Sequence, residues 1–332
     1  MRLPAFQYHR PSSTEGAYAL LGRLGKEAKV LAGGTALLVD LQQRLLRPEY
    51  IVSLNRIPDL QGIESDSQRG LRIGALTTLD SLKKSSLIKD KYDILIQAGE
   101  EVGVPALHHM ATIGGNLCLN TRCIYYNQSD FWSSVRLPCF KRGGELCYAV
   151  SGSNHCLAVY QGDLGTALMV LEAKVKLVRQ SGERTIPLSQ FFTYQAEIPN
   201  CLEPDEILTE VQVPPLPNFS TGAYEKLRIR GSMDFPLVSV AVMLEMKDAA
   251  ICRKARIVLG AVAPAPVVAT KAEEVLNDRT IDQELLEKAA QEAVREAHPV
   301  ANLSIDAGYR RKMVGVLLKR AIKRALSSAR VG

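Results

Sequence analysis

Apolar runs that end at glycine pairs divide the first half of the chain into short strands and helices. Residues 29–38 begin as an apolar strand, pass through Gly33-Gly34 and continue as a helix. A second pair, Gly114-Gly115, follows the β-branched residues Thr112 and Ile113, which favour the end of a strand. Glycine has no Cβ atom, so its backbone can approach a ligand closely and can adopt positive φ. We therefore expect two glycine turns, each at the end of a strand.

Other segments show the apolar spacing of strands or helices. Polar residues at 12–15 favour a helix cap, followed by a helix that runs to Arg23. Apolar and β-branched runs predict further strands, with the two latest antiparallel to each other. These strands are expected at 50–54, 237–246 and 255–262. Regular structure is expected at 157–160, and a helix turn followed by a strand at 167–179. Helices are expected at 77–85, 91–102, 271–276, 283–297 and 309–329.

The last of these helices is amphipathic and basic. Its apolar face comprises Met313, Leu317, Ala321 and Ala325. Its charged residues include Lys319, Arg320, Lys323 and Arg324. Some basic amphipathic helices bind membrane surfaces. The more common role of such a pattern is a helix that docks on its own protein with a solvated basic face, and this is our expectation.

Two changes of composition suggest the domain boundaries. The segment Pro214-Pro215-Leu216-Pro217 has the composition of a linker, and residues 56–59 are suited to end a small N-terminal unit. We expect three parts, at 1–57, 58–215 and 218–330. Within the second part, residues 122–156 are rich in cysteine, aromatic residues and glycine and show no clear periodicity. This stretch is expected to be a loop insertion.

Overall composition narrows the class of protein. Of the 332 residues, 46% are apolar and 23% are charged, and the net charge is +6, which is ordinary for a globular protein. No apolar run is long enough to span a membrane, and no dense basic run with interleaved aromatics suggests nucleic-acid binding. The N-terminus lacks the apolar core of a signal peptide. With seven cysteines and no secretory signal, the sequence indicates a reducing, cytoplasmic location.

Five of the seven cysteines lie between Cys118 and Cys156. From Cys123 onward they are separated by fifteen, seven and eight residues, without the paired C-x-x-C knuckles of many zinc sites. The reducing compartment argues against disulfides. The cluster therefore predicts a metal site, and the spacing leaves zinc and iron both open. Cys201 and Cys252 stand alone and are expected to be buried apolar residues.

The two glycine turns make a dinucleotide cofactor a reasonable hypothesis. Neither matches the G-x-G-x-x-G fingerprint of a Rossmann site, and the chain has no phosphate loop with Lys-Ser or Lys-Thr. Successive N–H groups in a glycine turn can instead form a concavity that binds phosphate. His108, His109 and His155 are potential ligands, but we expect them to be polar surface or loop residues.

Several motifs then recur in a fixed order along the whole chain. They are Ala32-Gly-Gly-Thr35, Ala111-Thr-Ile-Gly-Gly-Asn116, Gly162-Asp-Leu164, Tyr224-x-Lys226, Asp234-Phe-Pro236 and Tyr309-Arg-Arg311. In this order they resemble the FAD-binding subunit of the xanthine dehydrogenase/carbon monoxide dehydrogenase family of molybdenum hydroxylases. The resemblance implies an α+β fold with a two-part FAD-binding region of the vanillyl-alcohol-oxidase (PCMH) type. A C-terminal α+β domain like that of the carbon monoxide dehydrogenase flavoproteins would follow.

The cysteine-rich insertion points to a subgroup within this family, because most members of the family lack such an insertion. Its segment Asn120-Thr-Arg-Cys-Ile-Tyr-Tyr-Asn-Gln-Ser129 is similar to the FAD subunit of 4-hydroxybenzoyl-CoA reductases. In those enzymes the insertion binds an additional 4Fe–4S cluster. The resemblance implies that Cys123, Cys139, Cys147 and Cys156 are the cluster ligands, with Cys118 just outside.

The same resemblance implies which residues contact FAD. The phosphates would lie among Val30, Leu31, Ala32, Gly33, Gly34, Thr35, Ala36, Leu37, Ala111, Thr112, Ile113, Gly114 and Gly115. Asp163 would accept a hydrogen bond from a cofactor hydroxyl, and Val102, Ile186 and Lys226 would be further contacts. Two positions depart from the family pattern: Ala36 replaces an acidic residue, and His108 stands where the family often has arginine.

The function implied is that of an electron-transfer subunit without a substrate site of its own. Its partners would be a large molybdopterin subunit and a small 2Fe–2S subunit, in a heterohexamer built as a dimer of heterotrimers. Ferredoxin would supply electrons for removal of the 4-hydroxyl of 4-hydroxybenzoyl-CoA during anaerobic aromatic degradation. One alternative is the FAD subunit of an oxidative hydroxylase that passes electrons to NAD. Another is a non-catalytic flavin-bearing scaffold with structural zinc.

Overall fold

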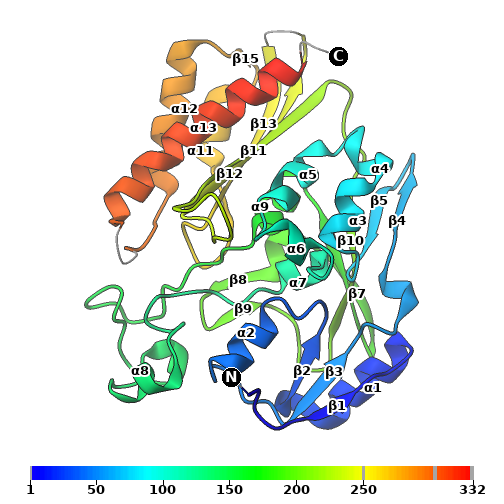
Figure 1. Cartoon of the computed structure of the whole chain (residues 1–332). Coiled ribbons are helices and arrows are strands. Elements are labelled where there is room, and N and C mark those ends of the chain that lie inside the picture. The colour runs from blue at the N-terminus through cyan, green and yellow to red at the C-terminus, as the bar shows by residue number, and fades with distance from the viewer. Residues whose placement is uncertain (1, 249–250, 302–304, 330–332) are drawn as a thin grey trace.

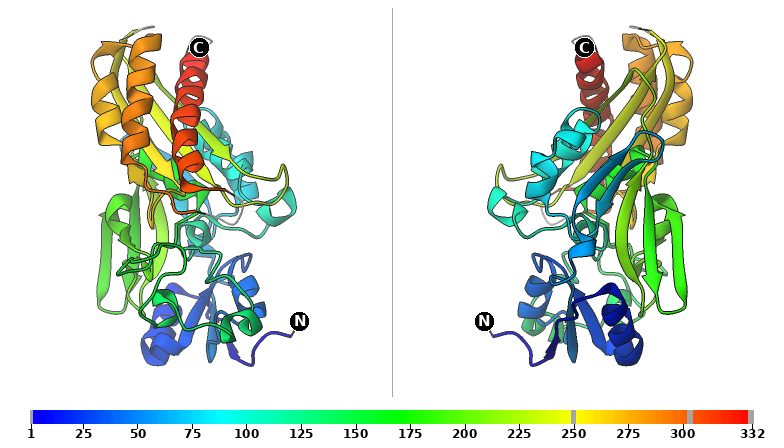
Figure 2. Two further views of the ribbon diagram at one scale, coloured as in Figure 1. Left: turned by 90° about the vertical axis from the view of Figure 1, so that its left-hand side faces the viewer. Right: turned by 90° about the vertical axis from the view of Figure 1, so that its right-hand side faces the viewer.

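Three units, each with its own sheet, follow one another along the chain (Figure 1). The computed structural model describes residues 2–248, 251–301 and 305–329. The first unit and the C-terminal helices lie at opposite ends of the molecule (Figure 2). Helices and strands are mixed in every unit, so the fold is α+β, as predicted.

The first unit is a small parallel sheet with two helices. Its strands β1 (Gln7–His9), β3 (Tyr50–Ser53) and β2 (Ala28–Leu31) lie in that order. Helix α1 (Thr14–Leu24) begins as predicted, because Ser13 Oγ accepts the N–H of Gly16 at 3.1 Å and caps the helix. A turn after β2 leads into α2 (Leu37–Gln42), which confirms the strand, turn and helix expected over 29–38.

The second unit is built on an antiparallel five-stranded sheet in the order β4-β5-β10-β6-β7. The strands are β4 (Ile63–Asp66), β5 (Gly70–Gly74), β6 (Lys174–Arg179), β7 (Gly182–Pro187) and β10 (Ile207–Val213), and β8 (Phe192–Gln195) pairs separately with β9 (Ile198–Asn200). The helices are α3 (Leu79–Lys84), α4 (Ser86–Lys89), α5 (Asp93–Glu100), α6 (Pro105–His108), α7 (Ile113–Leu117), α9 (Asp163–Val170) and α10 (Leu188–Phe191). The predicted helices at 77–85 and 91–102 are thus confirmed as α3 and α5.

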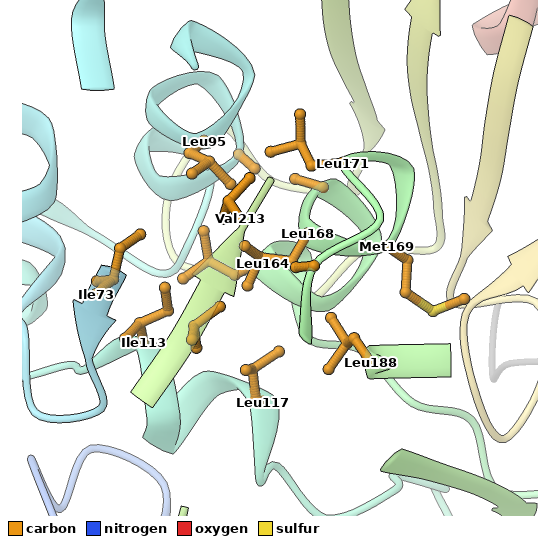
Figure 3. Packing of buried hydrophobic residues seen from close by; sticks show 14 of the residues in the cluster. Ile73, Leu95, Ile113, Leu117, Leu164, Leu168, Met169, Leu171, Leu188 and Val213 are labelled. Atoms are coloured by element: carbon orange, nitrogen blue, oxygen red, sulfur yellow. The ribbon is translucent and has the colours of Figure 1, made fainter. Parts of the chain in front are cut away.

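Helix α9 is the centre of this unit. All eight of its residues are buried, and Leu164 and Leu168 pack with Ile73, Leu95 and Val213 in the core (Figure 3). A helix that is apolar on every side must be covered on every side. Accordingly α9 contacts α5 and α7 in its own unit and the strands β12 and β13 of the third unit. It fixes the second and third units against each other.

The third unit places three helices on one face of an antiparallel sheet. Its strands are β11 (Ser220–Leu227), β12 (Val238–Met246), β13 (Ile251–Gly260), β14 (Val267–Val268) and β15 (Arg279–Thr280), and its helices are α11 (Thr270–Leu276), α12 (Gln283–Glu296) and α13 (Ala307–Ala329). β12 and β13 are antiparallel, as predicted. Arg310 of α13 is buried, and its guanidinium donates hydrogen bonds to the carbonyl oxygens of Leu237 and Ala261.

Helix α13 docks on β11 and β12 through its apolar face, as expected. Leu317, Ala321 and Ala325 are fully buried, whereas Lys323 and Arg324 are exposed. Within the described ranges, no helix combines the length and the apolar character that crossing a membrane requires. The exposed Lys323 and Arg324 lie on the solvated side of a helix whose apolar face is docked on its own sheet.

Three local expectations were wrong. Ile113 does not end a strand but begins α7, because Thr112 Oγ1 accepts the N–H of Gly115 at 3.1 Å and caps that helix. Residues 157–160 form no regular structure, since Val159 makes only an isolated bridge with Arg122. His108 is 1% exposed and is not a surface residue, whereas His109 and His155 are exposed as expected.

The insertion is irregular, as predicted. Its only described helical turns are α8 (Asp130–Ser134) and the 3-10 helix η3 (Phe140–Arg142), and α8 lies at its outer end (Figure 1). A surface ion pair between Arg47 and Asp130 joins it to the first unit. Of the two isolated cysteines, Cys252 is fully buried as expected, and Cys201 is half-buried against the core.

Candidate functional site

The turn between β2 and α2 offers a row of free backbone donors. Within the described residues, the N–H groups of Gly33, Gly34, Thr35 and Ala36 have no hydrogen-bond partner. Gly34 has φ of +74°, which a side chain disfavours. Successive free N–H groups in such a turn bind anions such as phosphate. This is the chemistry that the sequence predicted for the first glycine turn.

Gly33 brings this turn against the second unit. A Cβ atom at Gly33 would lie 1.7 Å from the carbonyl oxygen of Met110 and 3.2 Å from the nitrogen of Ala111. Only glycine fits such an approach. The turn and the segment before α7, which the sequence predicted as two parts of one site, therefore lie in contact.

The second glycine pair serves packing more than anion binding. Gly114 donates its N–H to the Ala75 carbonyl at 2.9 Å, and Gly115 donates to Thr112 Oγ1 at 3.1 Å. A Cβ atom at Gly114 would lie 2.8 Å from the Ala75 oxygen. Because both N–H groups already have partners, the free phosphate donors belong to the first turn. Contact of FAD with residues 111–115 stays a prediction.

Apolar side chains are exposed around the first turn. Val30 in β2, Leu38 and Val39 in α2, and Met110 opposite Gly33 are 38%, 39%, 40% and 53% exposed. The other predicted contacts from Leu31 to Leu37 are half-buried. Free N–H groups beside exposed apolar side chains suit a ligand that has both phosphate and a large organic part.

Asp163 and Lys226, both predicted cofactor contacts, form a buried ion pair. The Lys226 Nζ atom lies 3.1 Å from Asp163 Oδ1, and the two side chains are 0% and 4% exposed. The Tyr224 hydroxyl donates to Asp163 Oδ1 at 2.6 Å, and Lys226 also donates to the Glu101 carbonyl at 2.6 Å. Burial raises the pKa of Asp163, while Lys226 and Tyr224 oppose the shift. The pair joins the start of α9 to β11.

His108 holds the carbonyl of Val102, another predicted contact. The Nε2 atom lies 2.6 Å from the Val102 oxygen, which can only accept, so Nε2 carries the proton. Nδ1 then accepts a hydrogen bond from Lys83 Nζ at 2.7 Å. Both ring nitrogens are occupied within the second unit. Val102 and Ile186 are half-buried, and Ile186 lies in the edge strand β7 opposite Val175.

The four predicted metal ligands line one pocket in the insertion. Cys123, Cys139, Cys147 and Cys156 share its wall with Tyr125, Tyr126, Phe140, Lys141 and Leu146, among others. Burial raises the pKa of Cys123, and that of Cys156 to about 11. Cys118 lies outside, in the main core, where burial raises its pKa to about 12. The described residues contain no group of three His, Cys, Asp or Glu side chains arranged to hold a single metal ion.

Lys141 is a pocket residue that sequence reasoning missed. Its Nζ atom lies 5.2 Å from the centre of the Tyr126 ring, and its side chain lines the pocket with the four cysteines. The available signal was a lysine two residues after Cys139, within a stretch whose other features are cysteine and aromatic residues.

Comparisons with known proteins cover almost the whole chain. Residues 4–216 match the family described as the FAD binding domain in molybdopterin dehydrogenase, and residues 222–325 match the CO dehydrogenase flavoprotein C-terminal domain. The carbon monoxide dehydrogenase medium chain of Afipia carboxidovorans is 32% identical, with 98% of each chain covered. The 6-hydroxypseudooxynicotine dehydrogenase complex subunit alpha of Paenarthrobacter nicotinovorans is 28% identical, with 99% of this chain and 97% of the relative covered.

A solved structure shows the same fold. The carbon monoxide dehydrogenase of Hydrogenophaga pseudoflava, in a form lacking the Mo-pyranopterin moiety, contains a chain that superposes with a TM-score of 0.82 at 29% identity. The match covers 98% of this chain and 99% of that chain. The free phosphate donors, the matched domains and the common fold agree with one another. The chain belongs to the FAD-binding subunits of the xanthine/CO dehydrogenase, or molybdenum hydroxylase, family.

Proposed function

We propose that this chain carries both FAD and a 4Fe–4S cluster, as the electron-transfer subunit of a molybdenum-containing 4-hydroxybenzoyl-CoA reductase. Membership of the family supports FAD binding. The observation that carries the finer proposal is the single pocket lined by Cys123, Cys139, Cys147 and Cys156. These are the four cysteines that the resemblance assigns to the cluster.

The proposal of a cluster rests on the number and type of the ligands, since four cysteines line one pocket. A zinc ion draws its ligands to within about 2.3 Å of one point. The four cysteines line a common pocket, and among the described residues no set of side chains already surrounds a single metal ion. A 4Fe–4S cluster takes four thiolates around a larger core. Tyr125, Phe140 and Leu146 supply the apolar wall that limits access of water to such a group.

The chain provides distinct groups for each part of FAD. The N–H groups of Gly33 to Ala36 would bind the phosphates, and residues 111–115 would lie beside them. Asp163 would accept a hydrogen bond from a cofactor hydroxyl, with Lys226 holding the carboxylate charged. Val102 and Ile186 would be further contacts. Flavin exchanges one or two electrons, which suits transfer between donors and acceptors of different kinds.

We propose ferredoxin as the electron donor, docked on the insertion. Five large apolar side chains of this segment are exposed to solvent: Phe131 (71%), Trp132 (58%), Val135 (65%), Leu137 (71%) and Val150 (36%). Arg136 lies among them, with its guanidinium over the rings of Tyr125 and Tyr148. An apolar surface with a fixed cation beside the cysteine pocket suits an acidic redox protein.

The substrate site would lie on a partner subunit. The relatives are named as medium chains or as subunits of complexes. We propose a large molybdopterin subunit and a small 2Fe–2S subunit as partners, in a cytoplasmic heterohexamer made of two heterotrimers. Electrons would pass from this chain through the 2Fe–2S centres to the molybdenum site of the large subunit. There two electrons and two protons would convert 4-hydroxybenzoyl-CoA to benzoyl-CoA, with the 4-hydroxyl leaving as water.

The second candidate is the FAD subunit of an oxidative hydroxylase that delivers electrons to NAD. The 32% identity to a carbon monoxide dehydrogenase medium chain over 98% of the chain favours it. The two functions differ in the direction of electron flow and in the partner that exchanges electrons with this subunit.

Anaerobic purification of the complex distinguishes the two functions. The reductase should contain about four irons per FAD beyond those of the 2Fe–2S subunit. It should also reduce 4-hydroxybenzoyl-CoA with reduced ferredoxin. Reduction of the flavin by NADH, without extra iron and without ferredoxin activity, would contradict the proposal and support the oxidative hydroxylase.

A further inference from the structure

Lys141 is a half-buried ammonium whose hydrogen-bond partners are all neutral. Its Nζ atom donates to Asn120 Oδ1 at 2.8 Å, Thr121 Oγ1 at 2.5 Å and the Ala196 carbonyl at 2.6 Å. The described residues include no carboxylate in an ion pair with it. The same side chain lines the cysteine pocket.

Burying a charge without a countercharge is costly, so an anion is expected close by. Burial lowers the pKa of Lys141, and negative charge on Cys156, Glu197, Cys123 or Cys139 would oppose that shift. The Glu197 Oε1 atom accepts the N–H of Cys156 at 3.1 Å, so this carboxylate lies at one of the pocket cysteines. A cluster bound by the four pocket cysteines would place a further negative group beside Lys141, which lines the same pocket.

We propose that Lys141 is the built-in countercharge of the cysteine pocket, where it stabilises an iron–sulfur cluster and raises its reduction potential. The inference rests on the proposed function. A cluster held by four thiolates has a net negative charge, and reduction adds one electron from the donor. A nearby fixed cation favours the more negative form, because the attraction is strong where the dielectric constant is low. Net charge near a cluster is one of the factors that set its potential.

Lys141 has a second role that must be separated from the first. Through Thr121 and Ala196 the ammonium also ties the insertion to the body of the protein. Thr121 is fully buried and donates its own hydroxyl to the Ala196 carbonyl at 2.5 Å. Thr121→Val weakens this anchor and leaves the charge of Lys141 in place. Lys141→Gln removes the charge and keeps an amide that can donate to the same oxygens.

The experiment compares wild type, Lys141→Gln and Thr121→Val in the complete complex. Iron per FAD is measured first, and the cluster's midpoint potential is then measured by a redox titration followed by EPR. At a fixed ambient potential, Lys141→Gln should lower the ratio of reduced to oxidised cluster at least tenfold, a shift of about 59 mV for one electron. Loss of iron in Lys141→Gln alone supports the same conclusion, since the cation is then needed to hold the anionic group.

Each other outcome overturns the inference. Wild-type iron and potential in Lys141→Gln would show that the charge has no role. Equal changes in Lys141→Gln and Thr121→Val would show that Lys141 acts only as an anchor. A wild-type complex without the extra iron would overturn the proposed cluster itself, whereas the first two outcomes leave the cluster intact and overturn only the role of Lys141.

Discussion

Gly33 lies directly against the carbonyl oxygen of Met110, where the first unit meets the second. A Cβ atom at residue 33 would lie 1.7 Å from that oxygen, far inside any contact distance. The two segments predicted to hold the cofactor phosphates are therefore joined through a residue that has no side chain. Any side chain at position 33 must push the turn away from the second unit.

The Gly33→Ala variant should therefore lose most of its bound FAD. The methyl group moves the turn and its free N–H groups, and we expect at least a tenfold weaker retention of FAD. Flavin content after gel filtration is the measurement, with circular dichroism to check the fold. Gly231→Ala is the matched control, because a Cβ atom there meets nothing within 4 Å. Equal flavin contents in the two variants would mean that this turn does not hold the cofactor.

Gly115→Ala tests the second glycine pair separately. Among the described residues, apart from its chain neighbours and the backbone of α7, a Cβ atom at Gly115 would meet Thr112 Oγ1 alone, at 2.9 Å, and the N–H group of Gly115 already caps α7. We expect a smaller loss of FAD than in Gly33→Ala. A greater loss would show that the phosphates lie at α7 and not at the first turn. The comparison needs only the same flavin measurement on both purified variants.

Lys226→Met should destabilise the protein and weaken its hold on FAD. The change leaves the buried Asp163 carboxylate with Tyr224 as its remaining side-chain partner. Removing one member of a buried pair costs about 3–5 kcal/mol. Loss of the cation should also lower the potential of any flavin beside it. Chemical denaturation, flavin content and a redox titration would test these effects.

The cost of Lys226→Met should depend on pH in a definite direction. Burial already raises the pKa of Asp163 above its ordinary value of 3.8, and loss of Lys226 raises it further. A carboxyl with a raised pKa in the folded state binds extra protons on folding, so stability falls as pH rises through that range. The variant should therefore lose less stability relative to wild type at pH 5 than at pH 8. A constant or opposite difference would show that Asp163 is not responsible.

The sequence predicted the local elements well where one pattern dominated. Ser13 capped α1, and the apolar spacing of Leu317, Ala321 and Ala325 identified the docked face of α13. It failed at Thr112, because the same residue type favours strands and caps helices, and only its bond to Gly115 shows which applies.

The sequence was sufficient to identify the residues of the candidate site, but not the contacts between them. The motifs containing Asp163 and Lys226 were recognised, but their ion pair depends on how α9 packs against the third unit. Likewise the wide gaps between the cysteines did not show that the four side chains line one pocket. That pocket arises from how an irregular loop folds on itself. Lys141 was missed because its place in the pocket depends on hydrogen bonds to Thr121 and Ala196, which are distant in sequence.

Phe131 and Trp132 should contribute to the binding of the electron donor and not to the binding of the cofactors. Replacing both with Glu removes an exposed apolar contact and adds negative charge toward an acidic ferredoxin. We expect the KM for ferredoxin to rise about tenfold, which corresponds to about 1.4 kcal/mol of binding. Iron content, flavin content and turnover with an artificial donor should stay at wild-type values. An unchanged KM would place donor docking elsewhere on the complex.

Cys139→Ser should separate the cluster from the flavin. Four cysteines line the pocket, and the free N–H groups of the first glycine turn lie outside the insertion. The variant should lose about four irons per subunit and keep its FAD. Reduced ferredoxin should then support little turnover, whereas an artificial donor that reaches the flavin directly should still support it. Cys201→Ser, outside the pocket, is the control and should behave as wild type with both donors. Equal loss with both donors would mean that the insertion is structural, and no loss with either would mean that electrons do not enter through the cysteine pocket.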